Sequence, residues 1–194
     1  MLFEAASAAE VAAIAAAVRD AALPEVTELV PAARTVLVEV APGATLDRVR
    51  AAAAGAGDAG AAPEPGARHT IPVIYDGADL DLVAHTAGVS ADEVVALHSG
   101  AEYTVDFCGF APGFGYLSGL PGPLRQPRLE SSRSAVPPCS VGVADVYSCV
   151  YPRRSPGGWR LVGRADVDPR ELFDPSAERP ALLAPGDRVR FEPR

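Results

Sequence analysis

Arginines in the second half of the chain form two closely spaced groups that could bind an anion. Their members are Arg125, Arg128 and Arg133, and then Arg153, Arg154, Arg160 and Arg164. A guanidinium presents a planar set of donors that matches the oxygens of a carboxylate or a phosphate. A single arginine is more often a solvated counter-charge, but two groups in a chain of formal net charge −8 favour anion binding.

The run Cys108–Leu117 combines aromatic residues, glycines and a proline, and neither a regular helix nor a regular strand favours this mixture. Its aromatic residues Phe110, Phe114 and Tyr116 offer rigid contact surface. Two interpretations stay open at this point. The run either turns the corner of a β-barrel with Phe110 and Phe114 packed inward, or it forms a surface on which a substrate or a partner docks.

Other reactive side chains carry weaker signals. His98 is a candidate acid or base, although a histidine at a helix end more often makes a capping contact. Ser118 stands one place too late for the Gly-x-Ser-x-Gly motif of a nucleophilic serine. Asp79 and Asp81 lack the further oxygens of a metal loop, so we expect them to cap a helix.

The composition excludes several classes of protein. All 17 basic residues are arginines, so the chain has no lysine for a Walker-type phosphate loop or a Schiff base. The negative net charge argues against nucleic acid and anionic membranes as partners, and no apolar run of about 18 residues predicts a membrane span. The three cysteines and three histidines show no metal-ligand spacing. We therefore expect a cytoplasmic protein without a metal site, a disulfide framework or a secretory leader.

The first sixty residues predict a small α+β layer. Ser7 and Glu10 form a capping box at the start of a helix. The β-branched runs Val26–Val30 and Thr35–Val40 predict a pair of strands, and Thr45–Ala54 predicts a second helix. An alanine, glycine and proline stretch follows, which contributes little to a core and is typical of a linker. We place a domain in residues 1–60, a linker in residues 61–68 and a second domain in residues 69–194.

The second domain is predicted to be mostly β. A strand over Thr70–Tyr75 precedes two short helices, which end at Gly88 and Gly100. The helix pair has the spacing of a helix-turn-helix, but its second helix carries no basic residue, so we expect a structural role. Short strands between glycine and proline turns then predict a barrel or a sandwich. These strands are Tyr103–Phe107, Val141–Ala144, Val146–Tyr151, Trp159–Val162 and Arg188–Phe191.

Ordered motifs across this second domain resemble the family that contains the B-type subunit of 5-oxoprolinase, the sporulation kinase inhibitor KipI and allophanate hydrolase subunit 1. They include Ile71–Tyr75, Val94–Ser99, Phe107–Leu117, Ser155–Trp159 and Pro185–Asp187. The resemblance implies an α+β protein, with a small N-terminal α/β (ferredoxin-like) domain followed by a C-terminal cyclophilin-like β-barrel. It also implies an ATP-dependent amidohydrolase that opens 5-oxoproline to glutamate, in which this chain works with a homologous C-type subunit, and with an A-type subunit.

The resemblance assigns this chain a small lactam or amide as its substrate, and leaves open whether this chain or a partner binds ATP. Residues expected at the substrate or partner surface are Phe110, Pro112, Gly113, Phe114, Tyr116, Arg128, Arg133, Ser140, Trp159 and Arg164. One stretch departs from the family pattern, because Cys139, Asp145, Val146, Tyr147 and Cys149 stand where glycines or a glutamine are expected. A valine is unsuited to positive φ, so the departure favours an alternative, a non-catalytic regulatory protein such as a histidine-kinase inhibitor of the KipI type.

Overall fold

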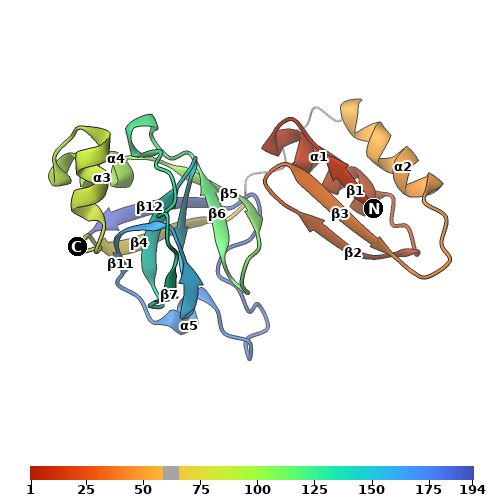
Figure 1. Cartoon of the computed structure of the whole chain (residues 1–194). Helices are drawn as coiled ribbons and strands as arrows, with labels where there is room; N and C mark the ends of the chain where they lie inside the picture. Colours follow the sequence, from red (N-terminus) through yellow and green to blue (C-terminus); the bar gives the residue numbers. More distant parts are fainter. Residues whose placement is uncertain (59–65) are drawn as a thin grey trace. The chain divides into compact units, whose positions relative to one another are not determined.

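The barrel predicted for the second half of the chain is present as a closed, seven-stranded barrel (Figure 1). The computed structural model describes residues 1–58 and 66–194 and divides the chain into two compact units, Met1–Glu64 and Pro65–Arg194. Residues 61–65 of the predicted linker lie outside the described residues. Arg68, its last predicted residue, begins the first barrel strand.

The first unit packs two helices on one face of a three-stranded antiparallel sheet. Its elements are β1 (Leu2–Glu4), α1 (Ala8–Asp20), β2 (Val26–Pro31), β3 (Thr35–Val40), α2 (Asp47–Ala54) and the short 3₁₀ helix η1 (Gly55–Asp58). Ser7 caps α1 by accepting a hydrogen bond from the backbone N–H of Glu10, which is one half of the predicted capping box. The other half differs, because the Glu10 carboxylate accepts from the backbone N–H of Ala6 and not of Ser7. The sheet order is β1-β3-β2. This arrangement follows the first five elements of a ferredoxin-like β-α-β-β-α-β unit, and no described residue of the first unit adds a fourth strand.

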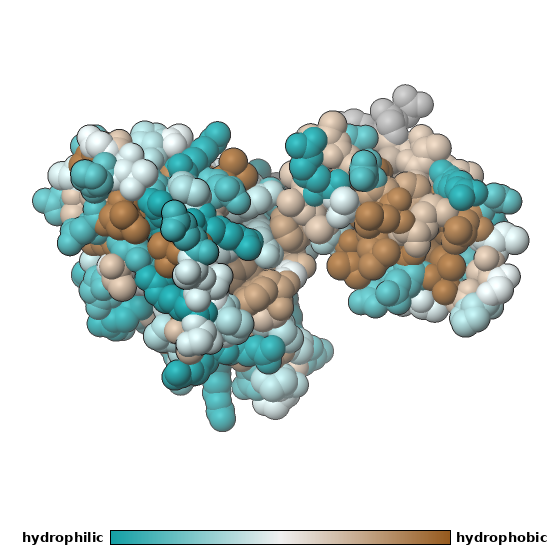
Figure 2. Space-filling view, in the orientation of Figure 1, coloured by the Kyte–Doolittle hydropathy of each residue, from teal (hydrophilic) through white to brown (hydrophobic). Residues whose placement is uncertain are grey.

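The two faces of this sheet differ in exposure. Val36 and Val38 of β3 are fully buried with the apolar face of α1. Leu37, between them in sequence, points to the other face and lies opposite Leu2 and Val30 in the neighbouring strands. These three side chains are exposed, and apolar residues gather on the visible face of this unit in Figure 2.

The second unit supplies the barrel and its covering elements. Its barrel strands are β4 (Arg68–Ile74), β5 (Tyr103–Cys108), β6 (Gly115–Ser118), β8 (Ser140–Ala144), β9 (Tyr147–Val150), β11 (Arg160–Ala165) and β12 (Arg188–Pro193). Their order is β11-β4-β12-β5-β6-β9-β8, with β8 pairing back to β11. Only β12 and β4 run parallel among these described pairs. The barrel also carries a two-stranded ribbon of β7 (Arg133–Val136) and β10 (Ser155–Gly157).

Two helices pack on the barrel in the way that the capping signals predict. Helix α3 (Leu80–Ala87) ends at Gly88, whose φ of 71° is readily adopted by glycine. Helix α4 (Ala91–Gly100) begins after Ser90, which accepts a hydrogen bond from the backbone of Glu93. α3 packs against β11 and α4 against β12. The remaining short helices are η2 (Gly122–Leu124) and α5 (Pro169–Leu172).

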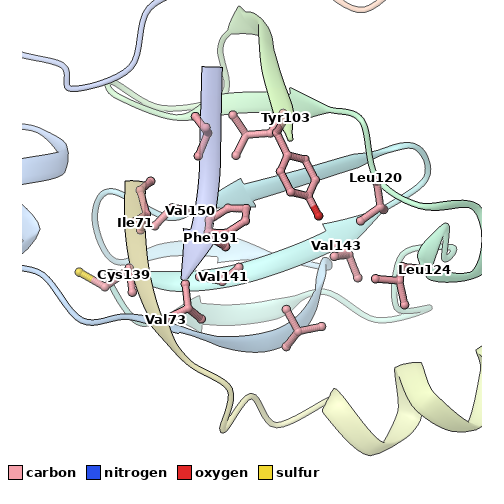
Figure 3. Packing of buried hydrophobic residues seen from close by; sticks show 14 of the residues in the cluster. Ile71, Val73, Tyr103, Leu120, Leu124, Cys139, Val141, Val143, Val150 and Phe191 are labelled. Atoms are coloured by element: carbon pink, nitrogen blue, oxygen red, sulfur yellow. The ribbon is translucent and has the colours of Figure 1, made fainter. Parts of the chain in front are cut away.

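Alternation of side chains divides the barrel strands into an inner and an outer face. Ile71, Val73, Val141 and Phe191 come from three different strands and point into the interior, where they form the main core (Figure 3). A smaller apolar cluster lies on the outer face. It contains Phe114, Val136, Ala144, Cys149, Tyr151, Trp159 and Leu161.

The stretch that departs from the family pattern still forms a regular hairpin of β8 and β9. Positive φ angles occur at Cys139 (63°) and Asp145 (50°), whereas Val146 does not adopt one. The strain expected from a valine at Val146 is therefore absent. The left-handed backbone falls on residues without a branched Cβ, and aspartate tolerates it comparatively well.

Candidate functional site

A β-bulge creates the aromatic surface outside the barrel. Val105 of β5 lies opposite Leu117, whereas Phe107 lies opposite Tyr116, so the register shifts by one residue between Val105 and Phe107. Val105 and Leu117 belong to the interior core, and the shift turns Phe107 to the outer face. There the Phe107 ring stacks on Tyr116 with centroids 4.2 Å apart.

A pocket of about 240 Å³ lies on this outer face beside Tyr116. It is lined by Phe110, Phe114, Tyr116, Arg128, Ser132, Tyr151, Pro156, Gly157, Gly158 and Trp159. Segments far apart in the sequence thus meet here: the aromatic run, the first arginine group and the segment Ser155–Trp159. Half of the lining residues are aromatic, and Arg128 and Ser132 add polar groups, a combination that occurs in small-molecule sites.

Phe114 is the centre of the pocket's aromatic wall. Its ring is 1% exposed and meets Tyr116, Tyr151 and Trp159 edge to face, with centroids 5.2, 5.2 and 5.7 Å apart. Edge-to-face pairs add about 0.5–1.5 kcal/mol each beyond the burial of apolar area. The wall is therefore rigid and preformed.

Phe110 forms the rim of the pocket at a conformational cost. Its φ is 69°, an unusual value for a bulky residue, and its side chain is 59% exposed while touching Phe114 edge to face. Backbone strain of this kind amounts to about 1–3 kcal/mol and is commonest at functional sites. Both interpretations of the aromatic run are therefore combined: Phe114 packs inward within the outer cluster, and Phe110 remains available for contact.

Two glycines let the aromatic wall approach the β10 segment. A Cβ on Gly157 would overlap the hydroxyl of Tyr151 and lie 3.0 Å from its Cζ. A Cβ on Gly158 would lie 2.8 Å from Oγ of Ser132. Glycine at position 157 therefore keeps Tyr151 at the pocket, whereas an overlap at Gly158 could be relieved by rotation of the Ser132 side chain.

Replacing Gly157 with alanine is expected to displace Tyr151 and lower the free energy of unfolding by about 1–3 kcal/mol, the usual effect of overpacking. Chemical denaturation followed by the fluorescence of Trp159, the single tryptophan of the chain, measures this. Gly122→Ala is the matched control, because a Cβ at Gly122 meets nothing within 4 Å. Equal stability of the two variants would contradict this account of the wall.

Arg128 contributes the pocket's formal charge. Among the described residues it forms no ion pair, in contrast to Arg133 and Arg164. Burial raises the pKa of Tyr116 and Tyr151 above the usual value of a phenol, and the nearby guanidinium of Arg128 opposes the shift. Both phenols are consequently neutral hydrogen-bonding groups at physiological pH.

Arg133 does not line the pocket, but it contacts Trp159, which does. Its Nη2 donates to both carboxylate oxygens of Asp79, at 2.7 and 2.8 Å, and its Nη1 donates to the carbonyl of Trp159 at 3.3 Å. Asp79, buried at the start of α3, also accepts the backbone N–H of Leu161 at 2.7 Å. The predicted capping role of Asp79 is therefore wrong: its side chain makes no capping bond and ties α3 to β7 and β11.

The structure brings some of the predicted site residues together and separates others. Phe110, Phe114, Tyr116, Arg128 and Trp159 line the pocket. The other five predicted surface residues lie outside its lining: Pro112, Gly113, Arg133, Ser140 and Arg164.

Three of those five have evident structural contacts. The backbone of Gly113 (φ 80°) passes so close to Phe173 that a Cβ would lie 2.8 Å from it. Ser140 is buried in β8, where its carbonyl accepts the backbone N–H of Tyr151. Arg164 pairs with the exposed carboxylate of Asp76 at 2.9 Å. These contacts favour structural roles for the three residues.

His98 is placed in the barrel interior, away from the pocket. It is 0% exposed, its ring stacks on Phe191 at 4.6 Å, and burial lowers its pKa to about 3. Nδ1 lies 2.8 Å from the hydroxyl of Tyr75, and Nε2 lies 2.9 Å from Oγ of Ser148. This placement argues against both the acid–base role and the helix-capping contact predicted for His98.

Sequence reasoning missed two polar residues of the pocket, Tyr151 and Ser132. The sequence predicts Tyr151 only as the end of a strand, because its place beside the Gly157 segment depends on pairing that the sequence does not display. Ser118, considered above as a nucleophile, donates to the carboxylate of Asp106 at 2.5 Å, and burial raises the pKa of that carboxyl. No histidine is among its described hydrogen-bond partners, so it lacks the base that a nucleophilic serine requires.

The pocket is chemically a binding site without an evident proton acceptor. None of its described lining residues is an aspartate, glutamate, histidine or cysteine. Within residues 1–58 and 66–194, no cluster of three or more such side chains could hold a metal ion, and no helix is long and apolar enough to cross a membrane. The arrangement can hold a small flat molecule and an anionic group, while a general base has to come from elsewhere.

Comparisons with known proteins agree with the fold described above. A model of the carboxyltransferase domain, subdomains C and D, matches residues 2–183. The curated B-type subunit of 5-oxoprolinase from Escherichia coli O157:H7 is 47% identical over 91 residues, which are 47% of this chain and 40% of that protein. The crystal structure of TTHA0988 is 36% identical, with a TM-score of 0.84 over 100% of this chain and 40% of its own.

A more distant solved structure shows the fold alone. Kluyveromyces lactis urea carboxylase is 20% identical, with a TM-score of 0.78 over 96% of this chain and 20% of its own. The match to the curated relative spans about 40% of that relative's length.

Proposed function

Because the chain belongs to the family of carboxyltransferase domains, subdomains C and D, we propose that it is one subunit of an ATP-dependent amidohydrolase complex that opens 5-oxoproline to glutamate. The main observation behind this proposal is the composition of the pocket. It offers aromatic walls and a free guanidinium, yet no carboxylate, imidazole or thiol among its described lining residues. Such a site binds a substrate and depends on another subunit for proton transfer.

The relatives support the complex as well as the reaction. The family resemblance seen in the motifs is confirmed by the family match and by curated B-type subunits of 5-oxoprolinase, which are 43–47% identical over 88–91 residues. A protein named as one lettered subunit implies that others exist. We propose a homologous C-type subunit, together with an A-type subunit, as partners within the cytoplasm.

The chemistry explains why ATP belongs to the proposal. The lactam ring of 5-oxoproline is unstrained, so its hydrolysis gains little free energy and benefits from coupling to ATP. The pocket does not fit a nucleoside triphosphate: its volume of about 240 Å³ lies below the roughly 300–1,000 Å³ of sites for drug-sized ligands, and one arginine faces it. We therefore assign ATP binding to a partner protein, and substrate holding to this chain.

Reconstitution tests the proposal directly. We expect the chain, purified together with its A-type and C-type partners, to release glutamate from 5-oxoproline only in the presence of ATP. The chain alone is expected to release none. The positive control is an established 5-oxoprolinase complex assayed in parallel; if that complex is active and the reconstituted one is not, the proposed reaction is incorrect.

A second candidate function is a non-catalytic binding protein, such as a regulator of a histidine kinase. The exposed and strained Phe110 favours it, because a bulky apolar side chain held in solvent is typical of a contact residue for another protein. Phe110→Ala separates the candidates. In a working hydrolase complex it is expected to change the KM for 5-oxoproline, whereas in a regulator it is expected to abolish partner capture without any hydrolysis to measure.

A further inference from the structure

We propose that the pocket recognises the free carboxylate of a small amide or lactam through Arg128, with the flat part of the molecule against Trp159 and Tyr116. The inference rests on the proposed function and names the chemical class that its substrate must have. It also predicts that amides without a carboxylate bind poorly. Three features of the pocket carry it: an uncompensated guanidinium, walls that accept a flat group, and a small volume.

The guanidinium of Arg128 is the first feature. Several arginines at the barrel strands are already engaged: Arg133 pairs with Asp79, Arg164 with Asp76, and Arg68 with Glu102. Arg160 donates to Thr86 and Gln126. Arg128 has neither an ion pair nor a side-chain hydrogen bond among the described residues. Its fork of donors is therefore free to bind a carboxylate in a bidentate manner.

The positive charge of the pocket also favours an anionic ligand. Arg128 is the one formally charged residue among the described residues of the lining, in a chain with a net charge of −8. The lowering effect of this cation on the phenol pKa values of Tyr116 and Tyr151 is consistent with a positive potential within the pocket. A cationic ligand is disfavoured here, and an anionic one gains from both the guanidinium and the neutral phenol donors.

A carboxylate suits this site better than a phosphate. A phosphate carries up to two charges and is usually held by several donors, such as a second cation or the N-terminus of a helix. The described lining holds a single cation, the guanidinium of Arg128, whose fork of donors matches the two oxygens of a carboxylate. The aromatic walls leave room for a flat amide group, for which stacking and edge contacts are favourable.

The pocket contains its own reporter. Trp159 lines it and is the single tryptophan of the chain, so its fluorescence responds to whatever occupies the site. The full chain would be titrated with 5-oxoproline, with 2-pyrrolidinone, which is the same ring without the carboxylate, and with inorganic phosphate. We expect a saturable change with 5-oxoproline, and at least tenfold weaker binding of 2-pyrrolidinone and of phosphate.

Arg128→Gln removes the proposed contact. The loss of a charge-assisted hydrogen bond is expected to weaken 5-oxoproline binding by about tenfold to a hundredfold while leaving 2-pyrrolidinone unchanged. The matched control is Arg154→Gln, which removes the same charge from an exposed arginine outside the lining. Circular dichroism of both variants checks that the fold is retained.

The outcomes of these titrations either support or overturn the carboxylate site. It is overturned if 2-pyrrolidinone binds as tightly as 5-oxoproline, if phosphate binds more tightly, or if both arginine variants weaken binding equally. Failure of the proposed reaction is recognisable separately. An inactive complex whose chain still binds 5-oxoproline through Arg128 rejects the reaction but keeps the carboxylate site, and an active complex with an unchanged KM in Arg128→Gln rejects the site alone.

Discussion

Acid is expected to destabilise the barrel unit between about pH 6.5 and pH 3 because of one buried imidazole. Burial lowers the pKa of His98 from 6.5 to about 3. In this interval the unfolded chain binds a proton at His98 and the folded chain does not, so protonation favours unfolding. The stabilisation is complete above pH 6.5 and is lost as the pH falls toward 3, by about 1.4 kcal/mol for each pH unit.

The hydrogen-bond network explains why the folded barrel holds the neutral ring. Oγ of Ser148 donates to the carbonyl of Gly142, so it accepts from Nε2–H of His98. The hydroxyl of Tyr75 then donates to Nδ1. Both ring nitrogens are satisfied in this neutral tautomer. A second proton on Nδ1 would require the Tyr75 hydroxyl to turn from donor to acceptor and would place a positive charge in an apolar core.

His98→Gln tests the origin of this acid sensitivity. Glutamine does not titrate, so the slope of the unfolding free energy between pH 6 and pH 4 is expected to decrease by about one proton, or roughly 1.4 kcal/mol per pH unit. At pH 7 the variant is expected to be less stable than the parent chain by about 1–3 kcal/mol, because the paired hydrogen bonds are disturbed. His85→Gln, on the exposed side of α3, is the matched control and should keep the parent slope.

Much of the barrel could be predicted from local sequence. Alternating apolar residues predict inner strands such as Tyr103–Phe107 and Arg188–Phe191, because one face of each strand is buried. In the structure these strands extend to Cys108 and Pro193. The helices α3 and α4 follow from Gly88 and Ser90, whose chemistry is local to the helix ends. The strands β6, β7 and β10 were not predicted. They span three or four residues each, and β10 contains Pro156, so pairing with distant segments determines them rather than propensity.

The site shows the same division between local and distant causes. The aromatic run is recognisable as a contact surface from its composition. What distinguishes Arg128 from Arg133 is an acid far away in sequence: Asp79 lies 54 residues before Arg133 and neutralises it, while Arg128 has no such partner among the described residues. The residue type indicates that an arginine can bind a carboxylate. Only the tertiary structure shows which arginine is already paired with a carboxylate of the protein itself.

The Asp79–Arg133 pair is the second feature whose loss is expected to have a large effect. Asp79→Ala should lower the free energy of unfolding by about 2–4 kcal/mol, because it leaves the guanidinium of Arg133 and the backbone N–H of Leu161 without their acceptor. Asp79→Asn keeps an acceptor for Leu161 and should lower it less. Chemical denaturation followed by Trp159 fluorescence measures both changes.

The exposed pair Asp76–Arg164 is the control for this prediction. Both pairs join the segment around α3 to strands beyond it, but the carboxylate of Asp79 is 8% exposed and that of Asp76 is 51% exposed. An exposed pair contributes little, so Asp76→Ala should change the free energy of unfolding by at most about 1 kcal/mol. Because Arg133 also holds the carbonyl of Trp159, Asp79→Ala should shift Trp159 emission and weaken 5-oxoproline binding, which Asp76→Ala should leave intact. Equal effects of the two substitutions would show that the buried pair neither stabilises the barrel specially nor positions the pocket wall.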